Sequence, residues 1–196
     1  MSRQRNKRSI VGISGSPRRH ANSEVLLDRA LEGAALEGAI VDKIVLNELC
    51  LMPCQGCYRC GKKGVCAVKD DMKLVYKKLD GADGLVIASP IYFGSLTAQL
   101  KIMIDRFESY WVRKYVLKRP KPYKRRSGIF LCCAANENRK FFKNAMDITK
   151  HFFTTLDIEY RGALFCGRLT GPGDMIKRPQ TLDRAFRMGA MLAKRV

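Results

Sequence analysis

The stretch DGLVIAS, residues 83–89, constrains the fold more than any other part of the sequence. It is a short, almost wholly apolar run that contains Gly84 and is followed by Pro90. Such a strand has no polar face to turn toward solvent, so it is expected at the centre of a sheet that is covered on both sides. The sequence therefore predicts a sheet that lies between two layers of helices.

Strands and helices alternate along the rest of the chain. The predicted strands lie at 10–13, 39–46, 83–89, 127–134 and 158–166, the last one broken by Gly162. The predicted helices follow an N-cap at Asn22 or Ser23, a cap at Asp70, and starts near 96, 139 and 181. This alternation predicts a parallel, doubly wound α/β sheet with right-handed crossovers. We expect one domain over residues 1–196, with a basic tail at 1–7, a Cys-rich loop at 50–69 and a basic loop at 111–126.

Composition indicates the compartment and the kinds of partner that we expect for the protein. No apolar run approaches the roughly 20 residues that a membrane helix needs, and the N-terminus does not resemble a secretory signal, so we expect a cytoplasmic protein without a membrane partner. Cysteines clustered in a reducing compartment more often bind metal or act in redox chemistry than form disulfides. The net charge is +19, and the segment 113–126 is rich in Lys and Arg without an acidic residue. Such a run attracts phosphates, acidic proteins or nucleic acid, unless it is only a solvated loop.

The loop after the first strand, SGSPRRHANS at 14–23, has the features of a phosphate site. Such a loop lies at the carboxyl end of a strand, beside a helix N-terminus that attracts anions. The candidate ligands are the hydroxyls of Ser14, Ser16 and Ser23, the amide of Asn22 and the guanidinium of Arg18. Neither the glycine spacing of a dinucleotide site nor the Gly-Lys-Ser/Thr ending of a triphosphate loop is present, so we expect a mononucleotide monophosphate. The alternative is an ordinary polar turn with a serine cap.

The loop after the third strand, SPIYFGS at 89–95, suits a flat ring. Pro90 stiffens its backbone, Tyr92 and Phe93 offer aromatic faces, and Gly94 lets main-chain N–H groups approach a ligand. If the strand order is 2-1-3-4-5, this loop lies beside the phosphate loop, and the pair suits FMN. A role of Tyr92 or Phe93 in the core is the alternative.

Three motifs resemble those of one family. They are GISGSPR followed by NS, PCQGCYRCGKKGVCAVKDDM, and ASPIYFGSLTAQLKIMIDRF, within roughly residues 8–110. They are similar to the NADPH-dependent FMN reductase group of flavodoxin-like proteins, and within it to the iron–sulfur flavoproteins. The resemblance implies a five-stranded flavodoxin-like sheet of order 2-1-3-4-5, non-covalent FMN, and a homodimer or dimer of dimers. It implies a phosphate site of Ser14, Ser16, Arg18, Asn22 and Ser23, and a ring site of Pro90, Ile91, Tyr92, Phe93 and Gly94, with further contacts from Ala135 and Asn136.

Cysteines are concentrated in the segment 53–66, which contains Cys54, Cys57, Cys60 and Cys66. Three thiolates at successive intervals of three residues can meet three corners of a [4Fe–4S] cluster, and Cys66 can supply the fourth ligand. Structural zinc sites more often use two separated pairs of ligands, so zinc is a less natural occupant. The spacing also resembles the cluster motif of iron–sulfur flavoproteins, and free or redox-active thiols are the remaining alternative. The other cysteines are expected to be a bystander, Cys50, and core residues, Cys132, Cys133 and Cys166.

These features together predict an FMN-dependent oxidoreductase. It would pass electrons between NAD(P)H, or an acidic ferredoxin-like donor, and an acceptor by means of FMN and a [4Fe–4S] cluster. No side chain is expected to act as an acid, base or nucleophile, because the cofactors carry the chemistry. The first alternative is an NAD(P)H-dependent FMN or quinone reductase without a cluster. Two further alternatives are a basic, zinc-stapled nucleic-acid-binding module, which leaves both loops unexplained, and a flavin-free interaction protein.

Overall fold

A computed structural model describes residues 8–119 and 125–196 of the chain. Its strands form one parallel sheet in the order β2-β1-β3-β4-β5. They are β1 (Ser9–Ser14), β2 (Ile40–Val45), β3 (Gly84–Pro90), β4 (Arg126–Cys133) and β5 (Ile158–Cys166). The order is the predicted one, and the flavodoxin-like sheet is confirmed.

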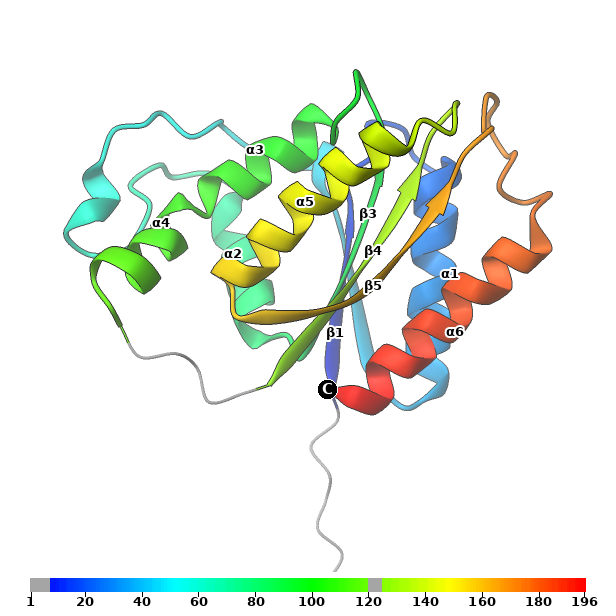
Figure 1. The fold of residues 1–196 in the computed structure, drawn as a ribbon. Helices are drawn as coiled ribbons and strands as arrows, with labels where there is room; N and C mark the ends of the chain where they lie inside the picture. The colour runs from blue at the N-terminus through cyan, green and yellow to red at the C-terminus, as the bar shows by residue number, and fades with distance from the viewer. Residues whose placement is uncertain (1–7, 120–124) are drawn as a thin grey trace, which may run out of the picture.

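Helices cover both faces of this sheet (Figure 1). One face is packed by α1 (Asn22–Leu36) and α6 (Pro179–Arg195), and the other by α2 (Met72–Gly81), α3 (Ala98–Arg106) and α5 (Arg139–Thr155). Shorter helical segments are η1 (Leu46–Glu48), η2 (Arg59–Gly61), α4 (Glu108–Trp111) and the π-helix η3 (Val112–Val116). The protein therefore has three layers, with the sheet in the middle.

The central strand β3 is buried from Gly84 to Ser89. Leu85 and Ile87 belong to the apolar cluster beneath α2, α3 and α5, whereas Val86 and Ala88 belong to the cluster beneath α1 and α6. Side chains alternate between the two faces of a strand, so a strand that is covered on both sides must be apolar at successive positions. The run at 83–89 therefore predicted its place in the sheet correctly.

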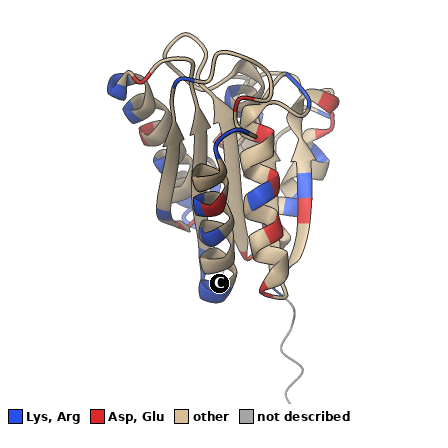
Figure 2. Ribbon diagram, turned by 90° about the vertical axis from the view of Figure 1, so that its right-hand side faces the viewer, with Lys and Arg blue, Asp and Glu red and all other residues tan. Residues whose placement is uncertain are grey.

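Helices α1 and α6 approach each other closely through two glycines. A Cβ atom on Gly189 would lie 1.8 Å from the carbonyl oxygen of Ala30, and one on Gly33 would lie 2.0 Å from that of Phe186. Neither position has room for any side chain, because the neighbouring atoms belong to the backbone. Figure 2 faces this pair of helices and shows that their outer surfaces carry Lys, Arg, Asp and Glu.

Two local expectations are wrong, and a third is confirmed only in part. Helix α1 begins at Asn22 itself, and no side chain caps it at Ala21. Strand β5 continues through Gly162, where its pairing with β4 only shifts register between Gly128 and Ile129. The N-cap residue of α2 is Asp71, although the neighbouring carboxylate of Asp70 does accept a hydrogen bond from the first helical N–H.

The segment 111–126, expected as a basic loop, starts as helix, because it contains the end of α4 and all of η3. Its residues 120–124 and the expected basic tail at 1–7 lie outside the described residues. None of the described helices combines the length and the apolar character that a membrane-spanning helix requires.

Candidate functional site

A cleft of about 400 Å³ lies at the carboxyl edge of the sheet, where the loops after β1, β3, β4 and β5 meet. This edge is where doubly wound sheets bind their ligands. The predicted residues that line it are Ser16, Arg18, Asn22, Ser23, Pro90, Ile91, Tyr92 and Ala135. The structure therefore brings the first and third loops together around one space, as their sequences predicted.

Four predicted residues do not line this cleft. Ser14 is buried at the end of β1, and Asn136 uses its amide oxygen to accept the Asn138 N–H at 3.1 Å. Phe93 is wholly exposed at the tip of its loop, with a relative exposure of 108%, so it has no role in the core. Gly94 lies beside it, close to the ring of Phe141.

The first loop presents hydroxyl groups at the start of α1. Ser16 holds the loop in a tight turn, since its hydroxyl donates to the Arg18 carbonyl at 2.9 Å and accepts the Arg18 N–H at 3.0 Å. Ser23 is 2% exposed and lines the cleft, and its hydroxyl oxygen has no hydrogen-bond partner; the hydroxyl of Ser14 is equally unpartnered. The first N–H groups of a helix lack intrahelical partners, and no side chain caps those of α1. The cleft therefore offers unused donors of the kind that bind an anion.

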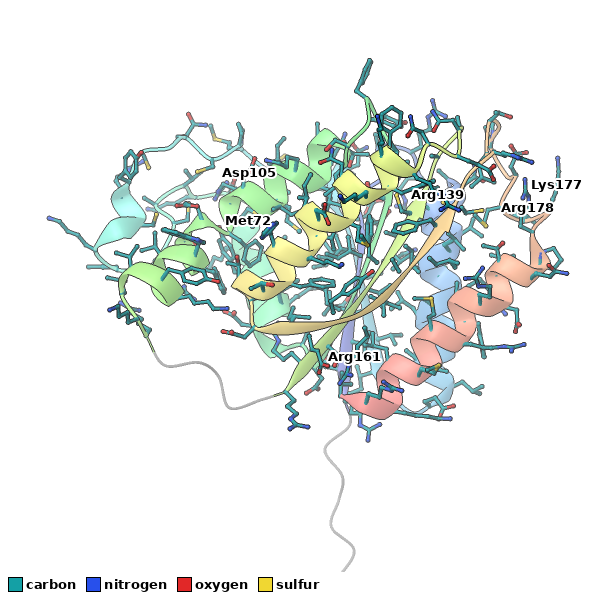
Figure 3. All side chains as sticks on the ribbon, in the orientation of Figure 1. Met72, Asp105, Arg139, Arg161, Lys177 and Arg178 are labelled. Carbon is teal, nitrogen blue, oxygen red and sulfur yellow. The ribbon has the colours of Figure 1, made fainter. Side chains whose placement is uncertain are left out.

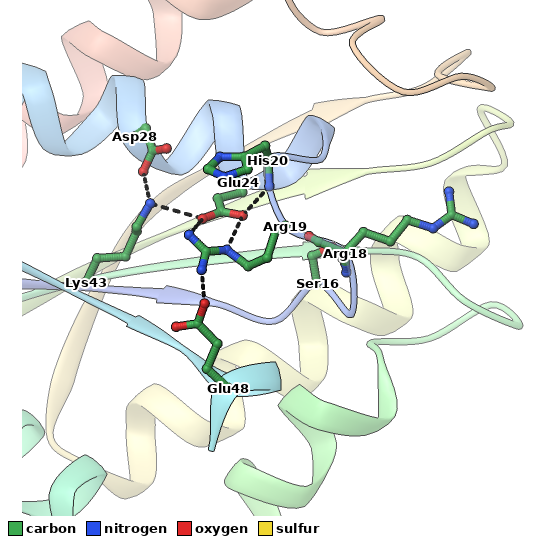
Figure 4. Close-up of polar contacts among 8 residues, drawn as sticks. All are labelled: Ser16, Arg18, Arg19, His20, Glu24, Asp28, Lys43 and Glu48. Atoms are coloured by element: carbon green, nitrogen blue, oxygen red, sulfur yellow. Dashed lines mark hydrogen bonds and ion pairs between the residues drawn. The ribbon is translucent and has the colours of Figure 1, made fainter. Parts of the chain in front are cut away.

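The buried carboxylate of Glu24 is hydrogen-bonded to this loop (Figure 4). Glu24 accepts the His20 N–H at 2.7 Å and the ammonium of Lys43 at 3.0 Å, and it pairs with Arg19 at 3.3 Å. Lys43 also binds Asp28, whereas the Arg18 side chain extends away from this cluster. Burial alone would raise the pKa of the Glu24 carboxyl, but its hydrogen bonds from Lys43, His20 and Arg19 outweigh burial and hold the pKa below the usual value. The carboxylate is therefore ionised and holds the backbone of the first loop at His20.

The third loop is a tight turn at the rim of the cleft. Tyr92 and Ser95 exchange two backbone hydrogen bonds of 3.0 Å, and the two residues between them have positive φ angles of 49° at Phe93 and 74° at Gly94. A turn of this kind requires positive φ at both central positions, which explains the glycine. The Asn144 amide donates to the Gly94 carbonyl at 2.9 Å and ties the turn to α5. The turn leaves the ring of Phe93 wholly exposed, whereas Tyr92 lines the cleft.

The fourth wall of the cleft, Leu169–Pro172 in the loop between β5 and α6, was not predicted. The Asn22 amide holds this loop, because it donates to the Gly171 carbonyl at 3.0 Å and accepts the Met175 N–H at 2.9 Å. Asp174 stabilises the loop from within, accepting the N–H of Gly171 at 2.7 Å. The turn sequence GPGD at 171–174, shortly after the fifth strand, was the available signal. Lys177 and Arg178, labelled in Figure 3, follow it at the same edge of the molecule.

The cysteine loop borders a second and larger cavity, of about 630 Å³. Cys54, Cys57, Cys60 and Cys66 all line this cavity, together with residues of α3, α4 and α5. Among residues 8–119 and 125–196, no three Cys, His, Asp or Glu side chains converge closely enough to form a metal site. Cys60 nevertheless interacts electrostatically with Cys54 and Cys66. The thiols are thus gathered around one space without forming a closed ligand set.

The thiols of this loop differ in acidity. Hydrogen bonds from the backbone and side chain of Arg59 lower the pKa of the Cys57 thiol, whereas burial raises the pKa of the Cys60 thiol. The cysteines expected in the core, Cys132, Cys133 and Cys166, are all buried, and Cys50 is exposed outside the cavity lining.

Several cations of the segment 113–126 are not free for a partner. Arg113 donates to the Gly64 carbonyl at 2.6 Å and lies over the ring of Tyr110. Lys114 pairs with Asp157 at 2.8 Å. Arg126 is buried and donates to the carbonyl of Ala82 at 3.1 Å, as well as to those of Leu79 and Leu156. These three residues bind other parts of the chain. The described cations of the segment 113–126 that remain exposed are Lys118, Arg119 and Arg125.

The sheet order and the cleft at its carboxyl edge define a flavodoxin-like α/β protein. The sequence profile of the NADPH-dependent FMN reductase family matches residues 8–138, which is more than half of the chain. The chain therefore belongs to the NADPH-dependent FMN reductase family, as the motifs predicted.

The chain is also similar to two curated relatives and, in fold, to one solved structure. It is 43% identical to an iron–sulfur flavoprotein of Methanocaldococcus jannaschii over 97 residues, which are 50% of each chain. It is 38% identical to an iron–sulfur flavoprotein of Methanosarcina thermophila over 109 residues, or 56% of this chain and 57% of the relative. The matches thus span about half the length of these curated relatives. An NAD(P)H:quinone oxidoreductase from Methanothermobacter marburgensis has the same fold, with a TM-score of 0.70, 19% identity, and coverage of 95% of this chain and 98% of that chain.

Proposed function

We propose that the protein is an FMN-dependent oxidoreductase that transfers electrons between NAD(P)H, or a ferredoxin-like protein, and an acceptor. One observation carries the proposal: a buried serine hydroxyl, that of Ser23, faces no partner in a cleft at the start of α1. Leaving a buried polar group unpaired costs free energy, so such a group is expected to meet a ligand. Family membership supports FMN as that ligand.

The cleft residues fit the parts of FMN. The Ser23 hydroxyl, the N–H groups of the first turn of α1 and the exposed Arg18 would hold the phosphate. Pro90, Ile91 and Tyr92 line the other side of the cleft and would border the flat ring, with Ala135 beside them. Ser14, Phe93, Gly94 and Asn136 of the predicted set lie outside the lining and would act as supports or through small movements of the loops. Asn22 lines the cleft, but its amide is bound to Gly171 and Met175, so it would act by holding the fourth wall.

FMN, when bound, supplies both hydride acceptance and single-electron release. The protein's own contribution is to hold the phosphate at one end, to orient the ring at the other and to exclude water between the four loops. The charge on Glu24 keeps the phosphate loop in place, and the amide of Asn22 keeps the fourth wall closed. No side chain needs to give or take a proton in this scheme.

We further propose that the cysteine loop binds a [4Fe–4S] cluster, which when bound supplies one-electron transfer. The four thiols line one cavity, and thiolate is the ligand that these clusters require. The names of the two archaeal relatives support a cluster in this family. We place the activity in the cytoplasm, on a homodimer or dimer of dimers.

A substitution at Ser23 tests the flavin site. Ser23→Ala should weaken FMN binding to the apoprotein about 10- to 100-fold, because a hydrogen bond to a charged group contributes about 1.5–3 kcal/mol. Binding is measured by quenching of flavin fluorescence. Ser109→Ala removes an equally buried hydroxyl from α4 and should leave the affinity unchanged. Equal affinities in all three proteins, or no flavin in the purified protein, would refute the site.

Anaerobic purification tests the cluster. We expect about four irons and four sulfides per chain, a count that follows from the cluster type, with a broad visible absorption beside that of flavin. Cys57→Ala should lose the iron, and Cys50→Ala, an exposed thiol outside the cavity lining, should keep it. Zinc in place of iron, or iron that survives in Cys57→Ala, would contradict the assignment.

A second candidate is an NAD(P)H-dependent FMN or quinone reductase without a cluster. The open arrangement of the thiols favours it, since no three ligands converge among the described residues. The solved quinone oxidoreductase of the same fold is consistent with such an activity. Metal-free protein that retains FMN and oxidises NAD(P)H would establish this candidate over the first.

A further inference from the structure

The two ends of the cysteine loop are joined at its base. The Asp70 carboxylate accepts the N–H of Met52 at 2.9 Å, and the Asp71 carboxylate accepts that of Cys50 at 2.8 Å. The Asp71 N–H returns a bond of 3.4 Å to the Cys50 carbonyl. The segment between Met52 and Asp70, which contains all four clustered cysteines, is therefore a closed loop with a defined neck.

One guanidinium from α3 locks this neck. Arg106 donates to the Met52 carbonyl at 2.8 Å on one side of the loop and to the Val68 carbonyl at 3.4 Å on the other. It also forms a two-pronged pair with Asp70, at 2.5 Å and 3.0 Å. Met72 and Asp105, which neighbour the pair in the sequence, are labelled near each other in Figure 3. A planar guanidinium can make all of these bonds at once, and a lysine ammonium cannot.

Stability alone does not account for this pair. The side chains of Arg106 and Asp70 are 0% and 6% exposed. A buried ion pair loses most of its attraction to desolvation, and apolar residues of similar size often replace it without loss. The Nε of Arg106 is moreover buried without a hydrogen-bond partner. If the pair served only to close the neck, apolar side chains in its place would do so at a lower cost in free energy.

The position of the Arg106 guanidinium beside the cysteine cavity explains why a charged pair is found at the neck. Arg106 lines the same cavity as the clustered cysteines, with Cys66 among them. An arginine guanidinium stays protonated at any ordinary pH, so the cation is permanent. A buried cation with an unused N–H beside thiolates is suited to stabilise negatively charged sulfur. Groups that orient metal ligands in this way typically change metal affinity about 10- to 100-fold.

We propose that Arg106 and Asp70 form a clamp that closes the neck of the cysteine loop and so holds its four thiols around one cavity. Both are positioning residues, because they act on the ligands and not on the metal. The role toward a metal rests on the proposed cluster. The closing of the loop by the clamp does not depend on the proposed cluster, and it can be measured without any metal.

The first measurement is amide hydrogen exchange of the full chain without metal. Arg106→Lys keeps the charge but cannot bridge both sides of the neck, and Asp70→Asn keeps the shape but loses the ion pair. In both variants we expect exchange across 52–68 to become at least about tenfold faster, while β3 and β4 stay protected. Arg126→Lys is the matched control, since Arg126 is also buried and also binds backbone carbonyls, three of them, but away from this loop.

The second measurement is the rate at which a chelator removes iron from the anaerobically loaded protein. We expect about 10- to 100-fold faster loss in Arg106→Lys and Asp70→Asn than in the wild type, and no change in Arg126→Lys. FMN content reports whether each variant is folded. Faster exchange and faster iron loss confined to the clamp variants would support the proposal.

Three results would overturn it. They are unchanged loop exchange in both clamp variants, wild-type iron retention in both, and an equal effect of Arg126→Lys, which would mean general loosening. If the wild type binds no iron, the proposed cluster fails, and hydrogen exchange alone then decides whether the clamp holds the loop.

Discussion

The carboxylate of Glu24 provides the sharpest test of how the loop after β1, the proposed phosphate site, is held. Glu24→Gln preserves the size of the side chain and one acceptor oxygen, but it removes the charge that pairs with Lys43 and Arg19. Neither cation is left alone, because Lys43 keeps Asp28 and Arg19 keeps Glu48. The loss should therefore fall below the 3–5 kcal/mol, roughly, of a buried pair whose partner is stranded.

The expected cost is about 2–3 kcal/mol at neutral pH. A hydrogen bond to a charged group contributes about 1.5–3 kcal/mol, and the remaining partners recover part of what is lost. With a urea m-value of about 2 kcal/mol/M, the midpoint of unfolding should fall by roughly 1–1.5 M. Glu32→Gln is the matched control on the same helix. Its ion pair with Arg29 is exposed, so its removal should cost at most about 0.5 kcal/mol.

The difference between wild type and Glu24→Gln should also depend on pH. The folded protein holds the pKa of Glu24 below the value of about 4.3 found in unfolded chains. Ionisation therefore stabilises the fold above that value, and the stabilisation disappears as the pH falls through the folded pKa. Other titrating groups are common to both proteins and cancel in the difference. Urea unfolding at several values between about pH 7 and pH 3.5 measures this, and a difference that is small at pH 7, or constant over the range, would refute the reasoning.

Three further predictions concern the helix pair, the fourth wall and the basic segment. Gly189→Ala puts a Cβ atom 1.8 Å from a carbonyl oxygen of α1 and should cost about 3 kcal/mol or more in urea unfolding; a loss under about 1 kcal/mol would mean that the helices separate freely. Asn22→Ala removes both bonds to the loop between β5 and α6, so amide exchange in that loop should quicken and FMN affinity should fall; unchanged exchange would contradict the contact. Neutralising Lys118, Arg119 and Arg125 should slow reduction by an acidic protein donor at low salt and leave reduction by NADPH unchanged; a salt-independent rate would leave the segment without a docking role.

The sequence predicted those parts of the protein that depend on local pattern. An apolar run without a polar face has one place in a sheet, so the central strand and the layers on both sides followed from residues 83–89 alone. The carboxyl ends of parallel strands share an edge, so loops with phosphate-binding and ring-binding character had to meet once the strand order was known. The family was predicted from the motifs of these two loops and of the cysteine segment.

The parts that were missed depend on contacts between distant segments. Asn22 was predicted as a phosphate ligand, but its amide is occupied by Gly171 and Met175, which are about 150 residues away along the chain. Arg126 was counted among free cations, because its neighbours in the sequence are basic, yet it is buried against three carbonyls. No local pattern distinguishes a solvated arginine from one that caps buried backbone groups.

Helix α3 connects the two candidate sites. At its N-terminus Thr97 donates to the Gly15 carbonyl at 2.5 Å and caps the helix by accepting the Leu100 N–H, so it holds the start of the loop after β1. At its C-terminus Arg106 holds the neck of the cysteine loop. The helix has nine residues and is therefore about 14 Å long, and its residues Leu100, Met103 and Arg106 are buried, whereas Lys101 and Asp105 are exposed. Because both anchors are on one short helix that packs against the sheet, the separation of the cleft at the carboxyl edge from the cysteine cavity is set by the fold itself.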